Sequence, residues 1–136
     1  MRKVKVKICG LKRAQDIECV NRLLPDYIGF VFVKTKREVT EQQAAKLKAM
    51  LNPQIKAVGV FVNAEIDKIL RLAESRTIDI IQLHGDEDAA YCERLRLQTE
   101  LPIIKAVRVK DAGSFENLQA YPCDYLLFDT YTKGQY

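Results

Sequence analysis

Four kinds of reactive side chain stand at or just after the ends of apolar segments in this sequence of 136 residues. They are a thiol, a guanidinium, an imidazole and a carboxylate, which belong in that order to Cys9, Arg37, His84 and Asp129. A guanidinium binds anions, whereas an imidazole, a thiol and a carboxylate can transfer protons. If the apolar segments are parallel strands of one fold, their ends meet on one rim. The four groups would then form a candidate active site for a small anionic ligand.

Each of these residues also has a purely structural interpretation. A cysteine at a strand end is more often an inert small hydrophobe, and an aspartate there is commonly a turn or cap residue. Arg37 closes a cationic stretch at residues 34–37, which is typical of a solvated surface. His84 precedes Gly85 and suits a hydrogen-bonded turn equally well. The catalytic interpretation therefore depends on the combination and on the motifs around it.

Alternating strands and helices are expected to position these residues. Six segments are rich in β-branched and aromatic residues, and several are apolar nearly throughout, as strands covered on both faces must be. In the first segment, alternation places Lys7 and Cys9 on one face, which should point into the mouth of the fold because the apolar face packs on helices. The six expected strands cover residues 4–9, 27–33, 57–62, 79–83, 103–109 and 125–129.

Helical periodicity fills the five intervals between these strands. The first apolar stripe ends at Pro25, and Thr40 with Gln43 indicates a capping box before the second. Asp86 is the expected N-cap of the fourth helix, and the fifth, around residues 115–118, is short. The first four stripes consist of Ile17, Val20, Leu23 and Leu24; Ala44, Leu47, Met50 and Leu51; Ile66, Ile69, Leu70 and Ala73; and Ala89, Ala90, Cys92 and Leu95.

Strand–helix alternation predicts an α/β fold with a parallel sheet, for which a doubly wound sheet and a (β/α)8 barrel are the alternatives. The first strand-to-helix turn lacks the G-x-G-x-x-G motif of a dinucleotide-binding sheet, which favours the barrel. A complete barrel has eight units, whereas this sequence supplies about five βα units and a sixth strand. We therefore expect a single TIM-barrel-type domain over residues 1–136, truncated after the sixth strand, with two open sheet edges.

Composition excludes several classes of protein. With 48% hydrophobic and 29% charged residues the chain is expected to fold, and no apolar run approaches the roughly 20 residues of a membrane span. The net charge of +4 comes without the aromatic stripe or recognition helix of a nucleic-acid binder. Four widely spaced cysteines and one histidine favour free thiols over a zinc site. We expect a mature cytoplasmic protein with no nucleic-acid or membrane partner.

Short motifs around the candidate residues carry a family resemblance along the whole chain. In order they are K-I-C-G at 7–10, G-F-V-F at 29–32 followed by T-K-R at 35–37, G-V-F-V-N at 59–63, Q-L-H-G at 82–85 and L-L-F-D-T at 126–130. With these motifs the chain resembles phosphoribosylanthranilate isomerase, which catalyses the third step from chorismate in tryptophan biosynthesis. The resemblance implies a TIM barrel that converts N-(5-phosphoribosyl)anthranilate to 1-(2-carboxyphenylamino)-1-deoxyribulose 5-phosphate by an Amadori rearrangement, without a metal or organic cofactor.

The same resemblance implies a role for each candidate residue. Cys9 corresponds to the general base of the family, and Asp129 corresponds to its general acid. Arg37 corresponds to the arginine that helps to hold the anthranilate carboxylate, and His84 to a histidine close to the substrate. Lys7 would line the mouth beside Cys9, where its positive charge favours the thiolate. The expected partner is therefore a phosphorylated small molecule.

Two departures from the family pattern leave alternatives open. T-K-R stands at 35–37 where the family usually has Ser-Pro-Arg, for which we expect tuning rather than loss of function. The glycine-rich motif and the last two strands, whose loops bind phosphate, lie outside this sequence, and without them substrate binding should collapse. One alternative is an inactive barrel fragment that self-associates through its open edges. Another is a Schiff-base aldolase with Lys105 or Lys7 as nucleophile.

Overall fold

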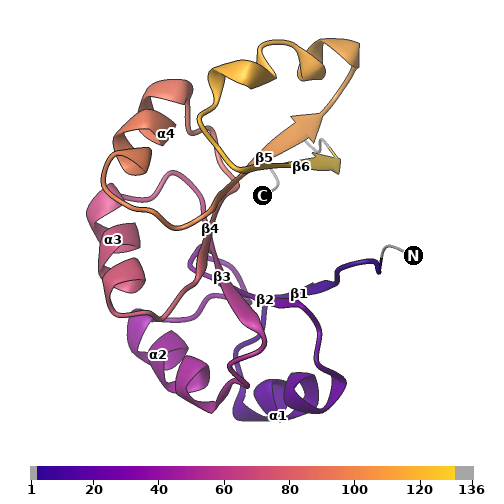
Figure 1. The fold of residues 1–136 in the computed structure, drawn as a ribbon, viewed down its shortest axis with the longest axis vertical. Coiled ribbons are helices and arrows are strands. Elements are labelled where there is room, and N and C mark those ends of the chain that lie inside the picture. Colours follow the sequence, from indigo (N-terminus) through magenta and orange to yellow (C-terminus); the bar gives the residue numbers. More distant parts are fainter. Residues whose placement is uncertain (1–2, 131–136) are drawn as a thin grey trace.

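Six parallel strands form one sheet in the computed structural model, which describes residues 3–130. The strands pair in chain order, so each lies beside the next one along the sequence. The sheet curls into an open arc with helices along its outer side (Figure 1). The strands are β1 (Lys7–Cys9), β2 (Tyr27–Val31), β3 (Lys56–Phe61), β4 (Ile80–Leu83), β5 (Ile103–Val109) and β6 (Tyr125–Thr130).

The connections between the strands are helical. Thr40 and Gln43 form the expected capping box, because the Thr40 Oγ1 accepts from the Gln43 N–H at 3.0 Å and the Gln43 Oε1 accepts from the Thr40 N–H at 2.8 Å. No helix within residues 3–130 combines the length and apolar character needed to cross a membrane. The helices are α1 (Ala14–Leu23), α2 (Glu41–Met50), α3 (Ile66–Glu74), α4 (Ala89–Arg96) and the short 3-10 helices η1 (Ala112–Phe115) and η2 (Leu118–Ala120).

The strand order distinguishes between the two expected sheet types. A doubly wound sheet reverses its strand order at a switch point, and its helices cover both faces. Here the order runs from β1 to β6 without reversal, and α1 to α4 all lie on the outer side of the arc (Figure 1). The barrel-type sheet is therefore confirmed, with β1 and β6 as the outermost strands of the described part.

Apolar side chains hold the sheet on both faces. Alternation along β4 turns Ile81 and Leu83 towards the helices and Ile80 with Gln82 towards the interior of the arc. Cys9 packs on the interior side, as the sequence predicts. The interior cluster is small and consists of Val31, Val58, Val60 and Ile80. The larger cluster lies between sheet and helices, and its fully buried members include Ile17, Ile28, Phe30, Phe61, Ile69, Leu95 and Ile103.

Two helix expectations are wrong. Asp88, and not Asp86, caps α4, since the Asp88 Oδ1 accepts from the Tyr91 N–H at 2.8 Å. Asp86 instead pairs with Arg108 at 2.9 Å, a partner that local sequence spacing does not reveal. The fifth helix is replaced by η1 and η2, because Asn117 between them adopts a left-handed backbone with φ 59° that interrupts any continuous α-helix.

The first βα unit also differs from expectation. The strand begins only at Lys7, where pairing with β2 begins, and the preceding Val4 and Val6 are 80% and 48% exposed. Leu23 and Leu24, expected in the buried stripe of α1, are largely exposed. Leu24 takes the left-handed conformation that ends the helix, which turns its side chain away from the core.

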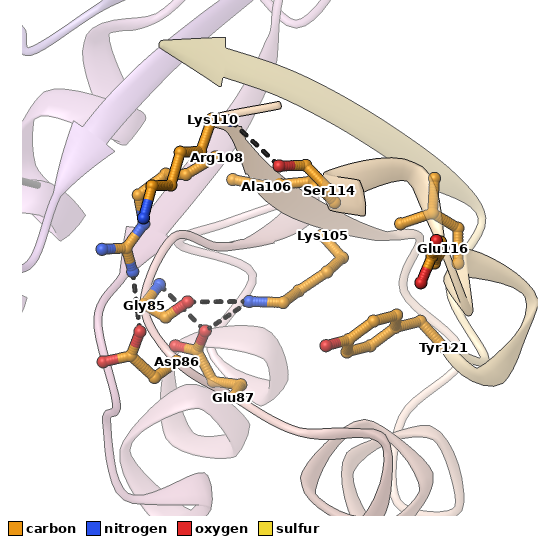
Figure 2. Close-up of a pocket in the computed structure, with 12 residues that line it drawn as sticks. Gly85, Asp86, Glu87, Lys105, Ala106, Arg108, Lys110, Ser114, Glu116 and Tyr121 are labelled. Atoms are coloured by element: carbon orange, nitrogen blue, oxygen red, sulfur yellow. Dashed lines mark hydrogen bonds and ion pairs between the residues drawn. The ribbon is translucent and has the colours of Figure 1, made fainter. Parts of the chain in front are cut away.

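A buried ion pair on the helix-facing side of the sheet joins two loops to strand β5. Lys105 lies on the helix-facing side of β5, where its Nζ is 3.1 Å from the Glu87 Oε1 and donates to the Gly85 carbonyl at 2.8 Å (Figure 2). Glu87 is fully buried and also accepts the Asn63 N–H at 2.8 Å and the Gly85 N–H at 2.9 Å. This carboxylate therefore joins the loops after β3 and β4, and Lys105 attaches both to β5 beside a cavity of about 470 Å³.

Replacing Lys105 with methionine is expected to reduce the free energy of unfolding by about 3–5 kcal/mol, because it leaves a buried carboxylate without its cation. Arg71→Met is the matched control, since Arg71 pairs with Glu41 at 3.4 Å on the exposed surface and should cost at most about 1 kcal/mol. Urea unfolding of both variants measures the difference. Equal costs for the two would contradict a structural role for the buried pair.

The sheet register places Gly29 directly beside Cys9 on the interior face. A Cβ atom at Gly29 would lie 2.6 Å from the Cys9 Sγ and 3.2 Å from its Cα. Real Cβ atoms do not approach other atoms as closely as 2.6 Å. The absence of a side chain at Gly29 therefore gives the thiol its place, which explains the glycine of the G-F-V-F motif.

Gly29→Ala is expected to destabilise the protein by about 1–3 kcal/mol through overpacking against the thiol. In a Cys9→Ala background the same substitution should cost clearly less, because its closest contact, the Sγ, is gone. Gly113→Ala serves as control, since its added Cβ would meet only the Asp111 Oδ1 at 3.1 Å. The four free energies of unfolding form a double-mutant cycle, and an equal cost of Gly29→Ala in both backgrounds would refute the close approach.

Candidate active site

The carboxyl ends of β1 to β4 enclose a cavity of about 90 Å³ on the interior side of the sheet. Cys9, Arg37 and His84 line it together with Gln82. Valine side chains from β2, β3 and the loops after them, among them Val31 and Val60, form the rest of its wall. The sequence prediction that a thiol, a guanidinium and an imidazole meet at one rim is thus confirmed for these three residues.

Arg37 reaches the cavity across the turn that follows β1. A Cβ at Gly10 would lie 2.5 Å from the Arg37 Cδ and 2.9 Å from its Nη1, so the guanidinium packs against bare backbone. Gly10 also has φ +90°, a conformation that L side chains rarely adopt. The Thr35 Oγ1 accepts from the Arg37 N–H at 3.2 Å and so supports the loop without the proline that is usual in the family.

A row of four polar side chains, here called the polar row, crosses the interior face from β1 to β6. It consists of Lys7, Gln82, His84 and Asp129. The Lys7 Nζ donates to the Gln82 Oε1. The Gln82 Nε2 lies 3.0 Å from the His84 Nδ1, and the His84 Nε2 lies 3.0 Å from the Asp129 Oδ2.

Burial differs along the polar row and controls its electrostatics. Gln82 is 2% exposed, the His84 side chain 15% and the Asp129 side chain 47%. Burial lowers the pKa of the Lys7 ammonium from its ordinary value, while the nearby Cys9 thiolate acts in the opposite direction. The Lys7 Nζ therefore lies in a partly desolvated place beside the thiol, where electrostatic interactions are stronger than in water.

The five expected site residues fall into two groups, those that line the cavity and those that contact its lining. Cys9, Arg37 and His84 share the cavity, whereas Lys7 and Asp129 reach it through their contacts with Gln82 and His84. The Asp129 Oδ2 is hydrogen-bonded to the His84 Nε2 at 3.0 Å, and its Oδ1 accepts from the Thr130 N–H at 2.9 Å. Base and acid candidates therefore stand on opposite edge strands of the described sheet.

Other polar residues at the strand ends do not line this cavity. The Asn63 Oδ1 accepts from the Asp86 N–H at 2.9 Å, and Arg108 pairs with Asp86. Lys105 is held by Glu87 on the helix-facing side of the sheet, as Figure 2 shows. Within residues 3–130, no three His, Cys, Asp or Glu side chains are grouped to hold a metal ion.

Gln82 is one of three site residues to which the sequence analysis assigns no role. Its signal is present in the sequence, because period two along β4 places residues 82 and 84 on the same face. Gly10 and Gly29 are the other two, and each lacks a side chain where Arg37 or Cys9 needs the space. Both glycines belong to the motifs, but their steric role depends on contacts between separate strands.

Comparisons with known sequences match almost the whole chain. The family model described as N-(5'phosphoribosyl)anthranilate (PRA) isomerase matches residues 6–135. An N-(5'-phosphoribosyl)anthranilate isomerase from Lachnoclostridium phytofermentans is 47% identical over 133 residues, which are 98% of this chain and 61% of the relative. One from Endomicrobium trichonymphae is 47% identical over 132 residues, 97% of this chain and 64% of the relative. The chain thus spans 61% and 64% of the length of these two curated relatives.

Solved structures show the same architecture. The crystal structure of phosphoribosyl anthranilate isomerase from Thermotoga maritima superposes with a TM-score of 0.83 at 34% identity, over 98% of this chain and 64% of that one. A phosphoribosyl anthranilate isomerase in complex with reduced 1-(o-carboxyphenylamino)-1-deoxyribulose 5-phosphate superposes with a TM-score of 0.80 at 34% identity, over 95% of this chain and 66% of that one. On the match over residues 6–135 and these superpositions, the chain belongs to the N-(5'-phosphoribosyl)anthranilate isomerase family.

Proposed function

We propose that the protein carrying this chain isomerises N-(5-phosphoribosyl)anthranilate to 1-(2-carboxyphenylamino)-1-deoxyribulose 5-phosphate in tryptophan biosynthesis. The observation that carries the proposal is the placement of Cys9 on β1 and Asp129 on β6, the two outermost described strands. Cys9 lines the cavity directly, and Asp129 is hydrogen-bonded to His84, which also lines it. Family membership supports the same reaction. A complex of a relative with a reduced form of the proposed product supports a phosphorylated small-molecule ligand.

Two proton transfers by protein side chains begin the reaction. Asp129 delivers a proton to the furanose ring oxygen, and the C1–O bond breaks to give an open-chain iminium. The iminium acidifies the C2 hydrogen, which the Cys9 thiolate removes to give an enolamine. Tautomerisation then adds a proton to C1 and removes the proton of the C2 hydroxyl, which gives the aminoketose. A proton donor on β6 and a proton acceptor on β1 suit a substrate that lies between the two strands.

The cationic residues supply binding and activation. Arg37, fixed over Gly10, offers a planar donor fork to the anthranilate carboxylate. Lys7 stands on the same face of β1 as Cys9 and brings a cationic side chain to the thiol. His84 is hydrogen-bonded to one carboxyl oxygen of Asp129 and so holds the proposed acid in place. No step of this scheme calls for a metal or an organic cofactor.

The structure does not favour the aldolase alternative. Lys105 is 4% exposed and bound to Glu87 on the far side of the sheet, away from Cys9 and His84. Lys7 donates to Gln82, and this hydrogen bond would have to break before its amine could act as a nucleophile. The expected self-association through β1 and β6 stays a prediction, as does a cytoplasmic location, which the four free thiols suit.

Cys9→Ala and Asp129→Asn are each expected to lower kcat by about 10²–10⁴-fold, because each removes one of the two proton-transfer groups. Cys19→Ala is the control, since this thiol is free and exposed on α1 and should leave kcat unchanged. Steady-state conversion of N-(5-phosphoribosyl)anthranilate, measured in the protein that carries this chain, gives the three values. Full activity in either the Cys9 or the Asp129 variant would refute the proposed assignment.

A further inference from the structure

The polar row contains an amide whose two ends face different partners. Gln82 is 2% exposed, so no bulk water replaces either partner. Its Oε1 accepts from the Lys7 Nζ, and its Nε2 faces the His84 Nδ1 at 3.0 Å. Rotating an amide by 180° exchanges its oxygen and its NH2 group. Its orientation is therefore fixed by a neighbour that can hydrogen-bond to only one of these two groups.

Lys7 settles the orientation of that amide. An ammonium group has three N–H donors and no acceptor, so it must face the amide oxygen. The amide NH2 then points at the His84 Nδ1, which has to accept a hydrogen bond. A neutral imidazole with an accepting Nδ1 carries its proton on Nε2, and this N–H donates to the Asp129 Oδ2 at 3.0 Å.

This arrangement decides where an additional proton goes. An unperturbed imidazole holds a proton more tightly than a carboxylate does, so a free His–Asp pair binds it on the histidine. In an imidazolium, however, Nδ1 would carry a hydrogen that points at the amide NH2 of Gln82. Two donors would then face each other in a buried place, and His84 would lose its hydrogen bond. A carboxylic acid at Asp129 creates no such conflict, because its Oδ2 can still accept from the Nε2–H.

We propose that Gln82, oriented by Lys7, is a positioning residue that keeps His84 neutral as the Nε2–H tautomer and so directs the shared proton to Asp129. The proposal rests on the proposed function for its catalytic meaning, since ring opening needs the acid form of Asp129. The hydrogen-bond logic itself does not depend on the reaction. It explains why a buried glutamine stands two residues before the histidine on the interior face of β4.

Other charged and titratable groups also face His84. Lys7 and Cys9 lie on β1, Arg37 follows β2, and Asp129 lies on β6. Among these groups, Asp129 lies 3.0 Å from the imidazole Nε2, and its carboxylate would also favour the Nε2–H tautomer. A test must therefore separate the effect of Gln82 from that of Asp129.

The sequence offers a direct spectroscopic test, because His84 is its single histidine. Long-range ¹H–¹⁵N correlation spectra of the chain labelled with ¹⁵N-histidine show one imidazole and distinguish the protonated from the unprotonated ring nitrogen. In the wild-type chain near neutral pH we expect the proton on Nε2. In Asp129→Ala, which changes a half-exposed side chain of β6, we expect the same tautomer, since Gln82 continues to donate to Nδ1.

Gln82→Glu is expected to reverse the logic. A carboxylate at this position accepts from Nδ1–H, so the imidazolium becomes stable and the midpoint of its ¹⁵N titration moves upward by about 1–3 pH units. Gln42→Glu on the exposed surface of α2 makes the same change in charge and should leave tautomer and midpoint unchanged.

Two results would overturn the proposal. One is an Asp129→Ala imidazole that carries its proton on Nδ1 or on a mixture of both nitrogens, since the tautomer would then depend on Asp129. The other is a folded Gln82→Glu chain with the wild-type midpoint. If Gln82→Glu does not fold, the Asp129→Ala spectrum decides alone. The spectra are recorded without substrate and do not depend on activity. The tautomer result therefore stands even if the isomerase assignment fails.

Discussion

The parallel register of the six strands decides which side chains of this protein can meet. A shift of one residue in any strand would turn its whole interior set towards the helices. The register is held by the large apolar cluster between sheet and helices, because only one alternation buries Ile81, Leu83 and Ile103 there. The alternate residues of each strand point to the interior face, and few of them are apolar. The other interior positions are therefore available for polar groups, and these form the candidate site.

The polar groups on the two faces of the sheet obey the same physical rule but serve different ends. Burial makes an unpaired charge or amide costly, so each must find a partner in the fold. On the outer side, Glu87 and Lys105 neutralise each other and fix loops. On the interior side, the polar row ends at Asp129, whose side chain is half exposed. The outer pair is closed on itself, whereas the polar row has one end open to solvent.

Local sequence signals predict the elements and motifs of this chain but not the contacts between strands. The strand over residues 103–109 and the Thr40–Gln43 capping box are confirmed, because a run of apolar residues and a capping box are written in adjacent positions. Asp86 and Asp88 both precede the fourth helix, and only a distant arginine distinguishes them. Gln82 and Gly29 act through partners on other strands, so single-sequence patterns cannot assign their roles.

The central claim is that Cys9 lies where the substrate binds, and its alkylation rate tests this directly. Peptide mass spectrometry would follow the thiols of the protein with and without reduced 1-(o-carboxyphenylamino)-1-deoxyribulose 5-phosphate. Cys19 is exposed and reports general reactivity, whereas burial raises the pKa of Cys92 to about 11 and keeps it unreactive. The account predicts that Cys9 alone is protected, by roughly 100-fold at about 100 times Kd. Labelling of Cys9 at an unchanged rate under saturating ligand would contradict it.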